Sequence, residues 1–132
     1  LCASQWHKSL SYKDNFFTDG MTYDADFNKA FGYAPPYQAA ESSAALLVFK
    51  DAFERANSFD TKKVRDALAA TDMQTFYGNI KFAAGGQNVS KPMVLFHVSC
   101  NDDGSKCENK VVAPTKWASA ELVHPIPSWS KR

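Results

Sequence analysis

The sequence predicts a domain of the α/β or α+β class, with about three helices followed by antiparallel strands. From Met21 to about residue 70 apolar residues recur at helical spacing, whereas the stretch TDMQTFYGNIKF at 71–82 alternates between apolar and polar residues, as a half-buried strand does. The 132 residues, 45% of them hydrophobic, are enough for one core, so we predict a single domain over residues 1–132.

The N-terminal part predicts a short strand, a loop and then a helix. Residues 1–20 show no sustained period and are rich in aromatic residues and turn formers. From Met21 to Phe31 apolar residues recur near helical spacing, and Gly32 follows, where a left-handed residue commonly ends a helix. A helix of about three turns is therefore expected here.

The longest helix is predicted from about Gln38 to Ala56. Pro35 and Pro36 cannot continue the preceding helix, because proline has a fixed φ and no N–H donor. The apolar residues of the predicted helix form a broad face, which comprises Ala39, Ala40, Ala44, Leu47, Val48, Phe49, Ala52 and Phe53. Asp60 is a suitable N-cap for a third helix over residues 61–70.

Two or three antiparallel strands are predicted after the third helix. Phe76, Ile80 and Phe82 nearly alternate with polar residues, and Gly78 indicates a bulge or the close approach of another segment. The loop AAGGQN then precedes a second apolar run, MVLFHV. The tail from Ala113 to Arg132 contains prolines and two tryptophans without a period, which predicts an extended surface segment.

The cysteines favour a disulfide. Cys100 and Cys107 bracket NDDGSK, whose Asp-Gly pair predicts a turn between two strand-like runs, so the thiols should face each other across a hairpin. Free surface thiols are the alternative, and a zinc site is disfavoured because His97 is the only nearby imidazole. Cys2 is left over, which predicts a free thiol or an intermolecular bridge.

Several features favour a secreted or extracytoplasmic location. The chain begins at Leu1, as a processed product would, and the sequon NVS makes Asn88 a candidate glycosylation site. The formal net charge of +1, with both signs interspersed, disfavours nucleic acid as a partner. The longest apolar run, AALLVF, is far below the roughly 20 residues of a membrane helix, so no membrane insertion is expected.

Ordered segments of the chain resemble a known family. QWHKSLSYKD, FGYAPPYQAAESSAALLVFKDAFERA, VRDALAATDMQTFYGNIKF, GQNVSKPMVLFHV and VVAPTKWASAELVHPIPSWS together resemble the C-terminal portion of branched-chain amino-acid type solute-binding proteins of ABC transporters. The resemblance extends from about Gln5 to Ser130 and implies part of a type I periplasmic-binding-protein-like fold that lacks its N-terminal part. Such proteins are two-lobed receptors that close around a ligand, and they are not enzymes.

The resemblance also implies candidate ligand-binding residues. Trp6 and His7 lie in the segment expected to approach the cleft, although Trp6 could equally pack in the core. Tyr37 and Gln38, near a helix N-terminus, could meet a carboxylate.

Two further residues complete the candidate site. Glu41 would serve a ligand ammonium or, in the favoured alternative, cap its own helix. Tyr77, beside Gly78, is the last candidate, with a packed aromatic residue as its alternative.

Two classes of function follow from these observations. The first is a non-catalytic extracellular protein, adapted to secretion, that binds a small amino-acid-like or carboxylate ligand. The second is a secreted module that recognises a protein or glycan through Phe16, Phe17, Trp117 and Trp129. No catalytic motif, cofactor or metal site is predicted. A homodimer is expected, since aromatic surface that a neighbouring lobe would cover needs another cover.

Overall fold

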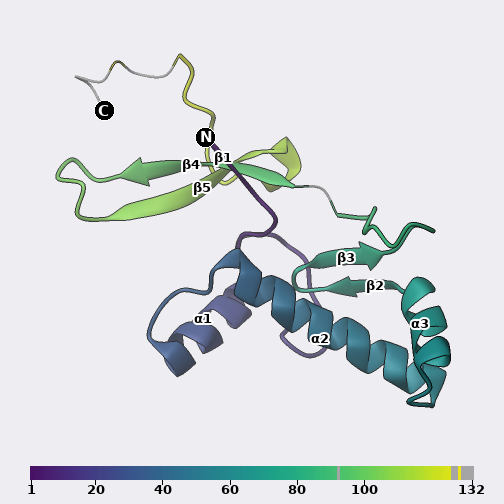
Figure 1. Ribbon diagram of the computed structural model, residues 1–132. Coiled ribbons are helices and arrows are strands. Elements are labelled where there is room, and N and C mark those ends of the chain that lie inside the picture. Colours follow the sequence, from purple (N-terminus) through teal and green to yellow (C-terminus); the bar gives the residue numbers. More distant parts are fainter. Residues whose placement is uncertain (92, 126–127, 129–132) are drawn as a thin grey trace. The chain divides into compact units, whose positions relative to one another are not determined.

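The computed structural model describes residues 1–91, 93–125 and 128 (Figure 1). Its elements follow in the order β1 (Cys2–Ser4), α1 (Gly20–Phe31), α2 (Tyr37–Ala56), α3 (Thr61–Ala69), β2 (Asp72–Thr75), β3 (Gly78–Lys81), β4 (Val94–Cys100), β5 (Cys107–Ala113) and the 3-10 turn η1 (Thr115–Trp117). The prediction of three helices followed by antiparallel strands is confirmed.

The chain divides into two compact units, which we call the helical unit and the sheet unit. The helical unit is Gln5–Met93 and contains α1, α2, α3 and the β2–β3 hairpin. The sheet unit combines Leu1–Ser4 with Val94–Arg132, because the N-terminal strand pairs with a strand from the second half of the chain.

The helices of the helical unit begin and end where local chemistry predicts. Asp19 caps α1 by accepting a hydrogen bond from the Thr22 N–H, and Asp60 caps α3 in the same way. Gly32 ends α1 in the left-handed conformation, with φ of 80°. After Asn57 ends α2, Arg55 donates to the carbonyl oxygen of Ala67 at 2.8 Å, which ties α3 to the preceding helix.

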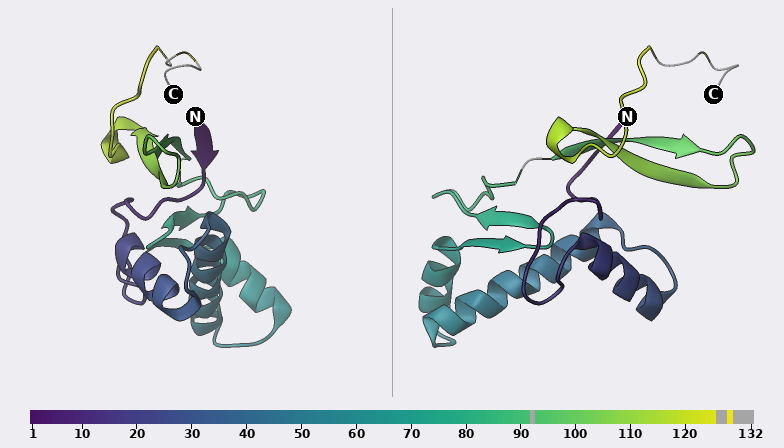
Figure 2. Two further views of the ribbon diagram at one scale, coloured as in Figure 1. Left: turned by 90° about the vertical axis from the view of Figure 1, so that its left-hand side faces the viewer. Right: turned by 180° about the vertical axis from the view of Figure 1, so that it is seen from behind.

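Helix α2 buries a narrower face than the sequence predicts. Its buried residues are Ala40, Ala44, Val48 and Ala52, a stripe of small side chains at intervals of four. Small side chains let the β2–β3 hairpin lie close along the helix, as Figures 1 and 2 show. Phe49 and Phe53, which belong to the predicted face, are 46% and 39% exposed and stack on each other instead.

The aromatic core of the helical unit is centred on Phe76, at the turn of the β2–β3 hairpin. Its ring is fully buried and lies 4.3 Å from Tyr23, 5.0 Å from Phe17 and 6.1 Å from Trp6, measured between centroids. The Asp14 carboxylate accepts hydrogen bonds from the backbone N–H groups of Phe76 and Phe17, both at 2.6 Å. The irregular segment after β1 is thereby fixed to the hairpin turn, and Phe76 belongs to the core.

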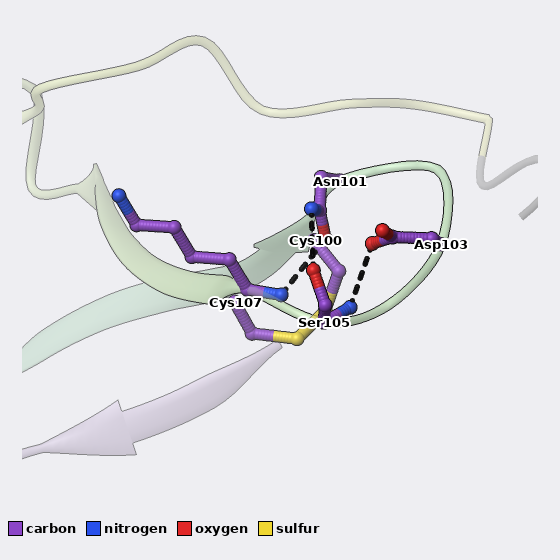
Figure 3. The surroundings of a disulfide bond; sticks show 6 residues. Cys100, Asn101, Asp103, Ser105 and Cys107 are labelled. Carbon is purple, nitrogen blue, oxygen red and sulfur yellow. Dashed lines mark hydrogen bonds between the residues drawn. A yellow bond between two sulfur atoms is a disulfide. The ribbon is translucent and has the colours of Figure 1, made fainter.

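The sheet unit is a three-stranded antiparallel sheet in the order β1-β4-β5. Cys100 and Cys107 are directly opposite across β4 and β5 and form the predicted disulfide (Figure 3). The predicted extended tail instead starts with η1, after which the Ser119 N–H donates to the carbonyl oxygen of Val111 at 2.8 Å. Trp129 lies outside the described residues.

Candidate functional site

An open pocket of about 830 Å³ lies within the helical unit. Its walls are supplied by α2, α3, the β2–β3 hairpin and the loop that follows β3. The pocket has an apolar floor, which is lined by Ala44, Val48, Ile80 and Phe82. The volume is in the range of small-molecule sites, which lies at roughly 300–1,000 Å³.

Oppositely charged side chains reach this pocket from different segments. Glu41 comes from α2, and Lys91 comes from the segment between β3 and β4. The Lys91 ammonium nitrogen lies 3.9 Å from the centroid of the Tyr77 ring, in cation–π geometry. That nitrogen has almost no exposed surface and no hydrogen-bond acceptor within the described part of the chain.

The electrostatics link these three side chains. Burial lowers the pKa of Lys91 from 10.5 to about 8, and the negative charge of Glu41 opposes part of that change. Burial also raises the pKa of Tyr77 far above its ordinary value, with smaller contributions from Glu41 and Tyr37. Tyr77 therefore keeps its hydroxyl proton at neutral pH and is available as a hydrogen-bond donor.

Gly78 makes the position of Lys91 sterically accessible. Its φ is +147°, which side-chain-bearing residues rarely adopt, and a Cβ at this position would lie only 2.5 Å from Cδ of Lys91. The lysine stem thus passes over the glycine to reach the Tyr77 ring. The close approach predicted for Gly78 is confirmed, and the approaching segment is Lys91.

The loop after β3 forms one rim of the pocket and is held by Asn88. The Asn88 side-chain oxygen accepts from the backbone N–H groups of Lys81 and Ser90, and its Nδ2 donates to the carbonyl oxygen of Asn79 at 3.2 Å. This side chain therefore extends the edge of β3. Asn88 is exposed, and its glycosylation stays a prediction.

The structure brings two of the predicted ligand-binding residues, Glu41 and Tyr77, to the pocket wall. Tyr77 is also 5% exposed, in keeping with its packed alternative. Glu41 lies beyond the first turn of α2, which begins without any side-chain cap, so the capping role favoured from the sequence is not formed. Tyr37 and Gln38 are exposed at the start of α2 and do not line the pocket.

The N-terminal candidates, Trp6 and His7, do not line the pocket either. Trp6 is 5% exposed and packs edge-on against Tyr23 and Phe76, as its core alternative predicts. His7 is half-buried, and its Nδ1 lies 2.8 Å from the Ser9 hydroxyl. The residue of this segment that reaches the pocket is Gln5.

Sequence reasoning missed Lys91, and it also missed Arg65 on the α3 side of the pocket. Lys91 stands next to a proline in a polar loop, which is an ordinary context for a solvated lysine. The sequence gives only an indirect signal. A glycine that follows the aromatic residue Tyr77 at the start of a strand indicates the close approach of another side chain or segment.

Residues 5–105 match the family described as periplasmic binding protein. The chain belongs to the periplasmic binding protein family. Membership implies that it binds small molecules outside the cytoplasm. The pocket of the helical unit has a size suitable for such a ligand. Among the described residues, no helix combines the length and the apolar character needed to span a membrane.

Proposed function

We propose that this periplasmic binding protein binds an amino-acid-like or other small carboxylate ligand in the helical-unit pocket and releases it chemically unchanged. The observation that carries the proposal is the combination of Glu41 with an apolar floor in a pocket of about 830 Å³. An apolar side chain of the ligand would cover Val48 and Ile80, and the Glu41 carboxylate would accept from its ammonium group.

The arrangement supports binding more than transformation. A tyrosine is protonated at neutral pH, and burial raises the pKa of Tyr77 further, so this side chain suits the role of a neutral hydrogen-bond donor. Within the described residues, no three histidine, cysteine or acidic side chains are grouped to hold a metal ion. We expect the ligand to leave with the same mass with which it entered.

The test is calorimetric titration against a panel of apolar amino acids, carboxylates and oligosaccharides, with the recovered ligand checked by mass spectrometry. Glu41→Gln should weaken the binding of amino acids by about tenfold or more, the usual effect of losing a charge-assisted hydrogen bond. Glu54→Gln is the matched control, because Glu54 lies on the same helix, is exposed and pairs with Lys50 outside the pocket.

Failure of this test has two forms. Equal affinity of Glu41→Gln and the parent chain for amino acids would remove Glu41 from the site. Binding of oligosaccharides or proteins in place of any small acid would favour the alternative, a secreted recognition module.

Secretion and self-association are part of the same proposal. The disulfide is consistent with an oxidising compartment, and the exposed Cys2 is available to a second copy. A homodimer should appear as twice the monomer mass in light scattering, and reductant should reduce that mass if Cys2 forms the link.

A further inference from the structure

The Lys91 ammonium has no hydrogen-bond acceptor in the described part of the chain. A primary ammonium carries three donors, and this one has no acceptor among the described residues and almost no contact with solvent. Isolated buried cations are unfavourable, so proteins normally give them a partner or water. Within the described residues, the contact that partly compensates this charge is the face of the Tyr77 ring, whose centroid lies 3.9 Å from the nitrogen.

Among the described residues, the charged and titratable groups around Lys91 do not supply a hydrogen-bond acceptor for its ammonium. The negative charge of Glu41 on α2 offsets part of the decrease in the Lys91 pKa, but the Glu41 carboxylate makes no ion pair with the Lys91 ammonium. Tyr37 contributes to the raised pKa of Tyr77 and not to that of Lys91. Arg65, across the pocket on α3, is another cation, and it lies 3.7 Å from Asp66. In the part of the chain that the structure describes, no anionic side chain is therefore in contact with the ammonium.

We propose that the Lys91 ammonium receives the carboxylate of the bound solute. This inference rests on the proposed function and specifies which end of the ligand each charge holds: Lys91 takes the carboxylate and Glu41 takes the ammonium. The ion pair would form by rotation of the lysine stem toward the open pocket that Lys91 already lines. No bond is made or broken, and the ligand stays intact.

A purely structural role for Lys91 would not explain why its ammonium is buried without an acceptor among the described residues. If Lys91 only covered the Tyr77 ring, a methionine of similar length would fill the same space over Gly78 without burying a charge. The stabilisation from one cation–π contact is small beside the cost of leaving a buried ammonium without acceptors. An anion from outside the chain resolves this imbalance.

The experiment compares the parent chain with Lys91→Met, using three probes that share one apolar skeleton: leucine, 4-methylpentanoate and isopentylamine. We expect the parent chain to bind leucine and 4-methylpentanoate, and Lys91→Met to lose at least tenfold in affinity for both. Isopentylamine, which has no carboxylate, should bind the two proteins equally. Lys116→Met is the matched control, because Lys116 lies over Trp117 at 5.3 Å in the other unit.

A titration of the parent chain gives a readout that needs no variant. In protein with ¹³C-labelled lysine, the Cε signal of Lys91 should titrate near pH 8 without ligand and at higher pH with 4-methylpentanoate, since a carboxylate stabilises the protonated form. The affinity for that acid should fall as the pH rises above 8.

The outcomes separate this inference from the proposed function. The role of Lys91 is overturned if Lys91→Met binds leucine as tightly as the parent chain does and 4-methylpentanoate does not change the pH at which the Lys91 Cε signal titrates. Solute binding would then remain in place. Failure of all three probes to bind overturns both. A Lys91 signal that titrates at the ordinary 10.5 shows that the ammonium is not isolated, which also overturns the inference.

Discussion

The two hairpins of this protein have turns of opposite character. The β2–β3 turn has two residues, Phe76 and Tyr77, and both are buried, with 0% and 5% of their surfaces exposed. The β4–β5 turn spans residues 101–106, and every residue in it is exposed. The first is fixed by groups distant in sequence, such as Asp14, whereas the second is fixed by its own polar side chains and a disulfide.

The difference shows how the pocket is kept in place. The β2–β3 turn carries Tyr77, so every interaction that fixes this turn also fixes the aromatic face under Lys91. Thr75 adds a local clamp, since its hydroxyl donates to the carbonyl oxygen of Gly78 and accepts from the Gly78 N–H. The β4–β5 turn carries no pocket residue, and a covalent link is sufficient for it.

The strongest test of this contrast is Phe76→Ala. Removal of a fully buried phenylalanine ring is expected to lower the free energy of unfolding by about 3–5 kcal/mol. Chemical denaturation followed by tryptophan fluorescence measures the change, because the Trp6 ring lies 6.1 Å from Phe76.

Phe59→Ala is the control, since Phe59 is 90% exposed and should change stability little. Comparable losses from the two substitutions would contradict the description of Phe76 as the centre of the core.

Removal of the disulfide tests the other hairpin. In Cys100→Ser with Cys107→Ser, the loss of a cross-link between residues seven apart is expected to destabilise the hairpin by roughly 2–3 kcal/mol through chain entropy. Amide hydrogen exchange in β4 and β5 should accelerate, while exchange around Phe76 and Thr75 should not. Faster exchange at both turns would show that the two hairpins are not fixed independently. Cys2→Ser is the control for the change of cysteine to serine, because Cys2 takes no part in this disulfide.

The sequence predicted the parts of the fold whose causes are local. Asp60 and Gly32 mark helix ends through capping and left-handed geometry, and the Asp-Gly turn with its flanking cysteines predicts the disulfide. Phe49 and Phe53 were misjudged because helical periodicity cannot tell which apolar side of α2 will be covered.

The pocket depended on non-local packing, which the sequence encodes weakly. Glu41 and Lys91 are 50 positions apart, and only the crossing of the Lys91 stem over Gly78 brings the lysine to the same wall. The turn η1 was missed for a different reason: three residues after a proline give too short a segment for any period to appear.

Asp14→Ala tests the long-range tie of the buried turn. The carboxylate accepts from the N–H groups of Phe16, Phe17 and Phe76, and its loss leaves the partly buried Phe76 N–H without an acceptor. An unsatisfied group of this kind costs about 1–3 kcal/mol, which denaturation curves resolve. Affinity for 4-methylpentanoate should also fall, since Tyr77 follows Phe76 in the turn. Unchanged stability would mean that aromatic packing alone fixes the turn.

The smallest effect is expected from Asp103→Ala, the counterpart of Asp14 in the exposed turn. Asp103 Oδ1 accepts from the Ser105 N–H at 2.9 Å, as Figure 3 shows, and this hydrogen bond holds the pKa of Asp103 below its ordinary value of 3.8. A carboxyl whose pKa is lower in the folded state stabilises the fold above about pH 4 and ceases to do so as the pH falls below that value. Because the side chain is fully exposed, water can replace it as the acceptor, so Asp103→Ala should leave the unfolding midpoint at pH 7 within error. A loss at pH 7 equal to that of Asp14→Ala would show that burial does not distinguish the two turns.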